Sequence, residues 1–290
     1  MTMALVTPPV AAATALPFEP GPVLRVYGMR RSGNHAILDA FLRNAPGGNA
    51  VFFNNCKRAQ DPVGTYRSLE VRGAGTPVKS DAPLADRLAY AGRRPLTLVS
   101  VEDAMPGAKA TAIWHENERP VLIYRSFLNW AASLLQKIKG NARYGPVERM
   151  RIMTQACRTY GAALRLVAEP GDILPVLYDR WVASETYRGD ILAALDLPHG
   201  DLSLGSVQRY GGGSSFQSEA RVPEDLDSDR RASALANDPE FCVFLWLVAH
   251  DADMSKTIAR HFPDDATRLL GLAEAAKMSM ALPDDGARPQ

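Results

Sequence analysis

The chain has 290 residues, and its 33 basic and 32 acidic side chains give a formal net charge of +1. This balance provides no overall attraction to nucleic acid or to an anionic membrane surface, so any anion site must come from a local cluster. The three cysteines are too few and too scattered for a disulfide framework or a zinc site, and the five histidines form no pair at metal-ligand spacing.

The first 22 residues contain five prolines and one charged side chain, Glu19, and they lack the basic segment of a signal peptide. We expect a disordered or loosely packed lead-in over residues 1–21 and one domain over residues 22–290. The most apolar window, residues 241–249, is about half as long as a membrane-spanning helix must be. We therefore expect a cytoplasmic protein with no stable membrane insertion and with reduced thiols.

The first predicted elements form a strand, a loop and a helix. Residues 23–27 alternate as in a strand, and residues 28–35 form a basic loop that contains Gly28 and Gly33. In the following helix, apolar residues recur at one-turn spacing on one face. A loop of this kind at a helix N-terminus is an anion site, because its N–H groups and the helix dipole both attract negative charge.

The loop can be compared with the Walker A pattern, G-x-x-x-x-G-K-[ST]. Gly28 and Gly33 occupy its two glycine positions, whereas Asn34 replaces the lysine and His35 replaces the magnesium-binding hydroxyl. Two recurring parts of a Mg-nucleotide site are thus missing. The cation occurs earlier in the loop, as Arg31, which indicates a phosphate site that works without a metal.

Further along the chain, apolar runs predict four more strands and five helices. The strands are expected at residues 50–53, 96–101, 120–124 and 173–178, and the helices at 127–139, 147–167, 184–195, 239–262 and 264–282. Residues 54–94 are polar and are interpreted as loops with short helical pieces. Near-continuous apolar strands separated by helices predict an α/β fold with a central parallel sheet of about five strands and a helical C-terminal region.

Ligands of such sheets bind beyond the carboxyl ends of the strands. Polar or aromatic residues follow the apolar runs at these ends: Arg31, Glu102, Asp103, Arg125 and Tyr178. Ser133 lies eight residues after Arg125, and the two side chains could reach one phosphate, with arginine as a charged fork and serine as a small neutral donor.

These two motifs, in this order, resemble those of the sulfotransferases that use 3′-phosphoadenosine 5′-phosphosulfate (PAPS). The family's 5′-phosphosulfate loop reads Lys or Arg, Ser, Gly, Thr, Thr, and residues 31–35 match its first three positions but depart from it at the two threonines. The family marks its 3′-phosphate site with an arginine and a serine eight residues later, with an intervening proline that is absent here. Residues 177–181 are similar to the family's Tyr-Glu-Asp-Leu strand end, and residues 210–216 to a glycine-containing loop over the cofactor.

The resemblance covers residues 22–216 and implies a P-loop nucleotide-kinase-like α/β/α fold. It implies transfer of a sulfonate from PAPS, which leaves the bisphosphate PAP, to a hydroxyl or amine of a small-molecule or carbohydrate acceptor, without a metal. It implies these cofactor contacts: Arg31, Ser32, Gly33, Asn34, His35, Ala36, Arg125, Ser133, Tyr178 (near the adenine), Gly212, Gly213 and Ser214. Arg31 would stabilise the charge on the leaving group.

The catalytic base is expected to be Glu102, since it precedes Arg125 by about the distance at which the family's catalytic histidine precedes its own arginine. Asp103 is the second candidate and His35 the third. Two other functions stay open. One is a P-loop phosphotransferase that uses ATP and Mg²⁺, and the other is a non-catalytic member that binds a nucleotide or a partner protein. The sequence does not indicate the oligomeric state.

Overall fold

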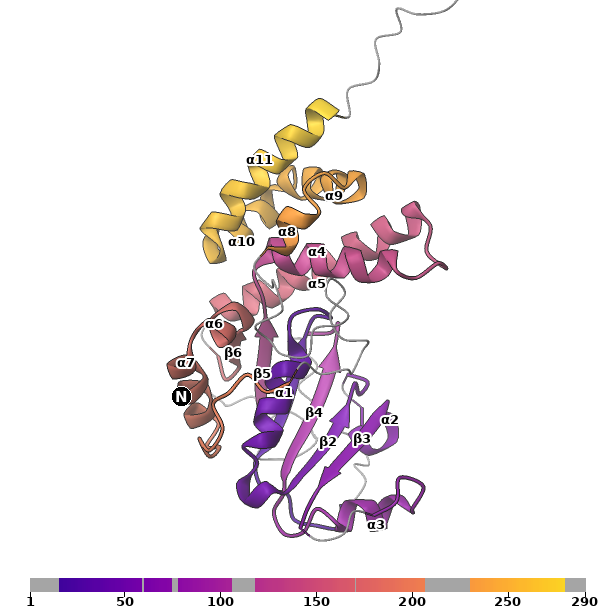
Figure 1. Ribbon diagram of the computed structural model, residues 1–290, viewed down its shortest axis with the longest axis vertical. Helices are drawn as coiled ribbons and strands as arrows, with labels where there is room; N and C mark the ends of the chain where they lie inside the picture. The colour runs from indigo at the N-terminus through magenta and orange to yellow at the C-terminus, as the bar shows by residue number, and fades with distance from the viewer. Residues whose placement is uncertain are drawn as a thin grey trace, which may run out of the picture.

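The structure, a computed structural model, describes residues 16–58, 60–74, 78–105, 118–169, 171–206 and 230–279. It is an α/β protein whose central mixed sheet has six strands in the order β3-β2-β4-β1-β5-β6 (Figure 1). The strands are β1 (Val23–Gly28), β2 (Ala50–Asn54), β3 (Ser68–Arg72), β4 (Leu96–Glu102), β5 (Glu118–Tyr124) and β6 (Leu174–Leu177). All neighbouring strands are parallel except β2 and β3, which are antiparallel.

The α/β class predicted from the sequence is confirmed. The edge strand β3, in a region interpreted as loops, corrects the expectation of a purely parallel sheet.

The central strand β1 determines where the candidate site lies. All six of its residues are buried, with β4 on one side and β5 on the other. The chain runs from β1 to β2 and back to β4 on one side, and then passes to β5 and β6 on the other. The direction of winding therefore changes at β1, and the crevice at its carboxyl end is the expected ligand position in such a sheet.

Helices cover both faces of the sheet. Those described are α1 (Asn34–Arg43), α2 (Pro62–Thr65), α3 (Leu84–Ala89), α4 (Phe127–Lys139), α5 (Pro146–Ala168), α6 (Tyr178–Ala183), α7 (Glu185–Ala194), α8 (Arg231–Ala234), α9 (Pro239–Ala249), α10 (Ala252–His261) and α11 (Pro263–Ser279), with a 3-10 turn at Pro46–Gly48. Helices α1, α6 and α7 share a core with one face, and α4 and α5 share a core with the other. This arrangement is compatible with three α/β/α layers.

The C-terminal helices form an additional layer. Helices α9, α10 and α11 lie on the far side of α4 and α5 from the sheet (Figure 1). The sequence predicted one helix over residues 239–262, which is wrong, because the chain breaks at His250 into α9 and α10. Asp251 explains the break: its carboxylate accepts a hydrogen bond of 3.0 Å from the Met254 N–H and so begins a new helix.

Three further features differ from, or add to, the expected elements. Tyr178 begins α6, whereas it was expected to end a strand. In the part of the lead-in that the structure describes, Leu16 and Phe18 pack against the core formed with β2, and residues 1–15 lie outside the described residues. Among the described helices, none is both long enough and apolar enough to cross a membrane.

Candidate functional site

The loop between β1 and α1 is held in one conformation by neighbouring elements. The Trp130 indole of α4 donates to the Arg30 carbonyl at 3.1 Å, and the Arg30 N–H donates to the Asp103 carboxylate at 2.8 Å. Within the loop, Ser32 N–H and the Asn34 amide both donate to the Met29 carbonyl, at 3.2 and 3.1 Å. These contacts fix the loop before any ligand arrives, which reduces the entropy cost of binding.

At both glycines of the Walker-like pattern, a neighbouring side chain occupies the space that a Cβ atom would need. A Cβ on Gly28 would lie 2.2 Å from Asn34 Oδ1. Gly33 has a φ of 88°, and a Cβ there would lie 2.0 Å from the Tyr178 ring. The second glycine thus lets the Tyr178 ring pack directly on the loop, where only a residue without a side chain fits.

Helix α1 presents its positive end at this loop. Gly33 is its N-cap, so among the described residues no side chain caps it, and its first turn contains no acidic residue. Ser32 is fully buried, and its Oγ has no hydrogen-bond partner among the described residues. The Ala36 N–H donates to the Gly33 carbonyl at 3.1 Å. The loop and the helix dipole therefore favour an anion at this position.

Three arginines from distant parts of the chain meet beside the loop. Arg231 Nη1 donates to Ser133 Oγ at 2.6 Å, and Arg31 Nε lies 3.4 Å from the same oxygen. Arg125 Nη1 lies 3.5 Å from the Arg31 carbonyl oxygen. We call Arg31, Arg125, Arg231 and Ser133 the arginine cluster. Arg125, Ser133 and Arg231 are each at most 5% exposed.

Burial and like charges act against the charged forms of Arg231 and Arg31. The pKa of Arg231 is lowered to about 9, first by burial and then by the positive charges of Arg125 and Arg31. The pKa of Arg31 is also lowered, first by burial and then by Arg125. Both shifts mean that a negative charge placed beside these guanidinium groups would favour their charged forms.

The structure brings together Arg31, Arg125 and Ser133 from the two sequence motifs, and it adds Arg231, which sequence reasoning missed. Arg231 lies 98 residues after Ser133 and outside the region of family resemblance. It belongs to the four-residue helix α8, which carries no motif that could have identified it. Its position depends on contacts of the C-terminal helices with α4: Ala232 N–H donates to Asn129 Oδ1 at 3.3 Å, and Leu128 N–H donates to Asp265 Oδ2 at 3.0 Å.

The two candidate acids at the end of β4 have different surroundings. Glu102 lies level with Gly28 in the sheet register, and its Oε1 is 3.7 Å from His35 Nε2 on α1. Its pKa is raised, first by burial and then by Asp103, while a hydrogen bond from Asn34 opposes the shift. The carboxylate of Asp103 instead accepts the Arg30 N–H and pairs with the Arg30 guanidinium. Glu102 thus combines a raised pKa with a histidine, rather than an arginine, as its ion-pair neighbour among the described residues.

His35 and Asn34 make protein contacts in place of the two threonines. The pKa of His35 is lowered, first by burial and then by Arg31, and both causes favour the neutral imidazole. The Asn34 side chain is buried and donates inward to Met29. Its amide nitrogen therefore does not extend as a Walker lysine would.

Tyr178 contacts both the loop and Arg125 of the arginine cluster. Its ring packs on Gly33, and the Arg125 guanidinium lies 5.1 Å from the ring centroid. At 8% exposure it supports the loop and Arg125, and its contact with an adenine stays a prediction. Gly212, Gly213 and Ser214 lie outside the described residues.

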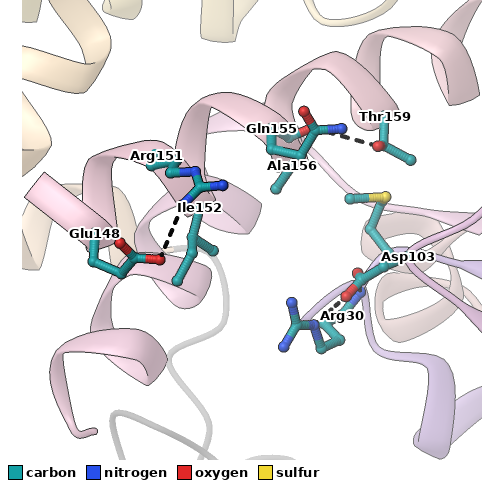
Figure 2. Close-up of a pocket in the computed structure, with 9 residues that line it drawn as sticks. Arg30, Asp103, Glu148, Arg151, Ile152, Gln155, Ala156 and Thr159 are labelled. Carbon is teal, nitrogen blue, oxygen red and sulfur yellow. Dashed lines mark hydrogen bonds and ion pairs between the residues drawn. The ribbon is translucent and has the colours of Figure 1, made fainter. Parts of the chain in front are cut away.

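A pocket with a volume of about 390 Å³ lies beside the loop. It is lined by Met29, Arg30 and Asp103 on one side and by one face of α5 on the other (Figure 2).

Within the described part of the chain, no three His, Cys, Asp or Glu side chains gather as metal ligands would. Neither a scan against protein-family models nor a search of curated proteins finds a match to this chain.

Proposed function

We propose that this chain is a sulfotransferase with a P-loop-like fold that moves a sulfonate from PAPS to a hydroxyl or amine without a metal. The observation that carries the proposal is the arginine cluster, because the guanidinium groups of Arg31 and Arg231 reach Ser133 Oγ and that of Arg125 lies at the Arg31 carbonyl, beside the N-terminus of α1. Two adjoining anion sites suit a nucleotide with separate 5′- and 3′-phosphates better than one with a single phosphate chain.

The two sites divide the nucleotide between them. Ser133, Arg125 and Arg231 would bind the 3′-phosphate, for which guanidinium groups offer paired donors. The start of α1 would bind the 5′-phosphate through backbone N–H groups of the loop. Arg31 belongs to the loop that would bind the 5′-phosphate, and its Nε lies 3.4 Å from Ser133 Oγ at the proposed 3′-phosphate site. Its charge would therefore act on both phosphates.

PAPS supplies a sulfonate activated by its bond to the 5′-phosphate. During transfer this S–O bond breaks, and a bond forms between sulfur and the acceptor oxygen or nitrogen. Arg31 and the α1 N-terminus would stabilise the negative charge left on the phosphate oxygen. Glu102 would take the acceptor proton, since a carboxyl with a raised pKa holds a proton more readily near neutral pH than an ordinary one.

The proposal is tested by calorimetric titration of the wild-type protein with PAP and with ADP in EDTA. A charge-assisted hydrogen bond contributes about 1.5–3 kcal/mol, so PAP should bind roughly 10- to 100-fold more tightly than ADP. Arg125→Ala should remove most of this preference and leave ADP binding nearly unchanged. Arg119→Ala is the matched control, because Arg119 lies near the other end of β5 and pairs with Asp196 at 2.7 Å.

Each failure selects a different alternative. Equal affinity for ADP and PAP, or binding that needs Mg²⁺, would favour the ATP-dependent phosphotransferase. PAP binding with no turnover of PAPS for any acceptor would favour a non-catalytic nucleotide-binding protein.

A further inference from the structure

The pocket beside the loop has a lining that balances its own charge. On the loop side the Arg30 guanidinium pairs with Asp103, and on α5 Arg151 Nη1 lies 3.7 Å from Glu148 Oε1 (Figure 2). Each guanidinium lies beside a carboxylate. A ligand with a net charge would therefore meet attraction and repulsion together at either wall.

The rest of the lining is apolar or neutral. Met29, Ile152 and Ala156 are the apolar side chains of the lining; Met29 is only 2% exposed, so the half-buried Ile152 and Ala156 offer most of the apolar surface. Gln155 and Thr159 add a neutral amide and a neutral hydroxyl along the same face of α5. Pockets of this volume lie within the range that holds small organic ligands.

We propose that this pocket binds a neutral, polyhydroxylated ligand the size of one or two sugar rings. Neighbouring hydroxyls both donate and accept, so they can bridge a guanidinium and a carboxylate without separating the pair, while the C–H face of a ring packs on Met29, Ile152 and Ala156. A charged ligand would have to break one of the ion pairs to gain a partner. The new pair gains little, because exposed pairs contribute little, while the charge of the ligand loses part of its hydration in the pocket.

The strand alternation places this pocket relative to the candidate base. Val101 packs with α4 and α5, so Glu102 points to the opposite face, toward His35 on α1. The pocket is on the α5 side and is lined by Asp103. A ligand here lies against Asp103 and the loop. Because Glu102 points away from this pocket, a ligand here is not the acceptor whose proton Glu102 would take, and its binding does not rest on the proposed function.

The test uses saturation-transfer NMR on the full chain with three matched sugars: neutral glucose, anionic glucuronate and cationic glucosamine, together with the neutral disaccharides maltose and lactose. We expect at least one neutral sugar to bind saturably and the charged counterparts of glucose to bind roughly tenfold more weakly, a difference of about 1.4 kcal/mol. Gln155→Trp should fill the pocket and abolish the signal. Thr154→Trp, at an exposed neighbouring position of α5 outside the pocket lining, should preserve it.

A charge change gives a second readout that does not depend on filling the pocket. Arg151 has an 80% exposed side chain, so Arg151→Gln should fold normally, and it leaves the lining with one excess negative charge. Glucosamine should then bind more tightly than glucose.

The proposal is overturned if no neutral sugar binds, if the charged sugars bind the wild-type protein as tightly as the neutral ones, or if the signal survives Gln155→Trp. PAP titration of the same samples separates the two ideas: sugar binding without PAP binding rejects the sulfotransferase and keeps the pocket, and the reverse result rejects the pocket alone.

Discussion

Replacing Arg231 with methionine should make the protein more stable and a poorer nucleotide binder at the same time. Arg231 is 5% exposed, and its charge lies beside those of Arg125 and Arg31. Methionine fills much of the same volume without the charge. The change therefore removes an unfavourable interaction of the unliganded protein and one of the proposed contacts to the 3′-phosphate.

The magnitude follows from the pKa of the guanidinium. A fall of the pKa from the ordinary value of an arginine to about 9 in the folded protein corresponds to an upper bound of about 5 kcal/mol against the charged form at pH 7. Because the unfolded chain binds this proton more tightly, the unfolding free energy of the wild type should rise as the pH increases above about 9, and the full penalty remains at neutral pH. Loss of the hydrogen bond to Ser133 offsets about 1 kcal/mol, and imperfect packing offsets more. We expect a net gain of about 1–3 kcal/mol in unfolding free energy.

Urea unfolding at pH 7 and calorimetric titration with PAP and ADP measure the two effects. Arg231→Met should bind PAP roughly 10- to 100-fold more weakly and bind ADP within a few-fold of wild type. Arg230→Met is the control, because this arginine is exposed one residue earlier and should change neither quantity. Lower stability of Arg231→Met in the absence of nucleotide, together with unchanged PAP affinity, would refute the interpretation of the cluster as an anion site.

Three further predictions concern the base and the loop. Glu102→Gln should lower turnover by roughly 10²-fold or more with PAP affinity nearly intact, and steady-state kinetics showing wild-type turnover would exclude this base. Because burial raises the pKa of Glu102, kcat/KM of the wild type should fall on acidification through a pKa above the ordinary 4.5, and a pH profile showing the same fall in Glu102→Gln would assign it to another group. Gly33→Ala should abolish PAP binding in a titration, since its Cβ would clash with Tyr178, whereas Gly64→Ala, which has open space around it, should bind as wild type does.

Local sequence patterns were sufficient for the main elements. The apolar runs predicted the strands that became β1, β2, β4, β5 and β6 to within about two residues, because buried parallel strands are apolar on both faces and stand out from polar connections. The helix over residues 127–139 was predicted to the residue. The strand β3 was missed, since an edge strand exposed to solvent carries the polar residues of a loop.

For the site, the sequence by itself determined that Arg31 would lie in a glycine-bearing loop after β1 and that Arg125 would follow a second buried strand. Parallel strands end at the same edge of a sheet, so their proximity could be foreseen. Only the tertiary structure decided that Arg231 joins them, because packing of α8 against α4 brings it across 98 residues to Ser133. It also decided that Glu102 and Asp103, adjacent in sequence, face different partners: Glu102 ends β4 beside His35, whereas the backbone turns out of the strand at Asp103, with a φ of 54°, and Asp103 pairs with Arg30.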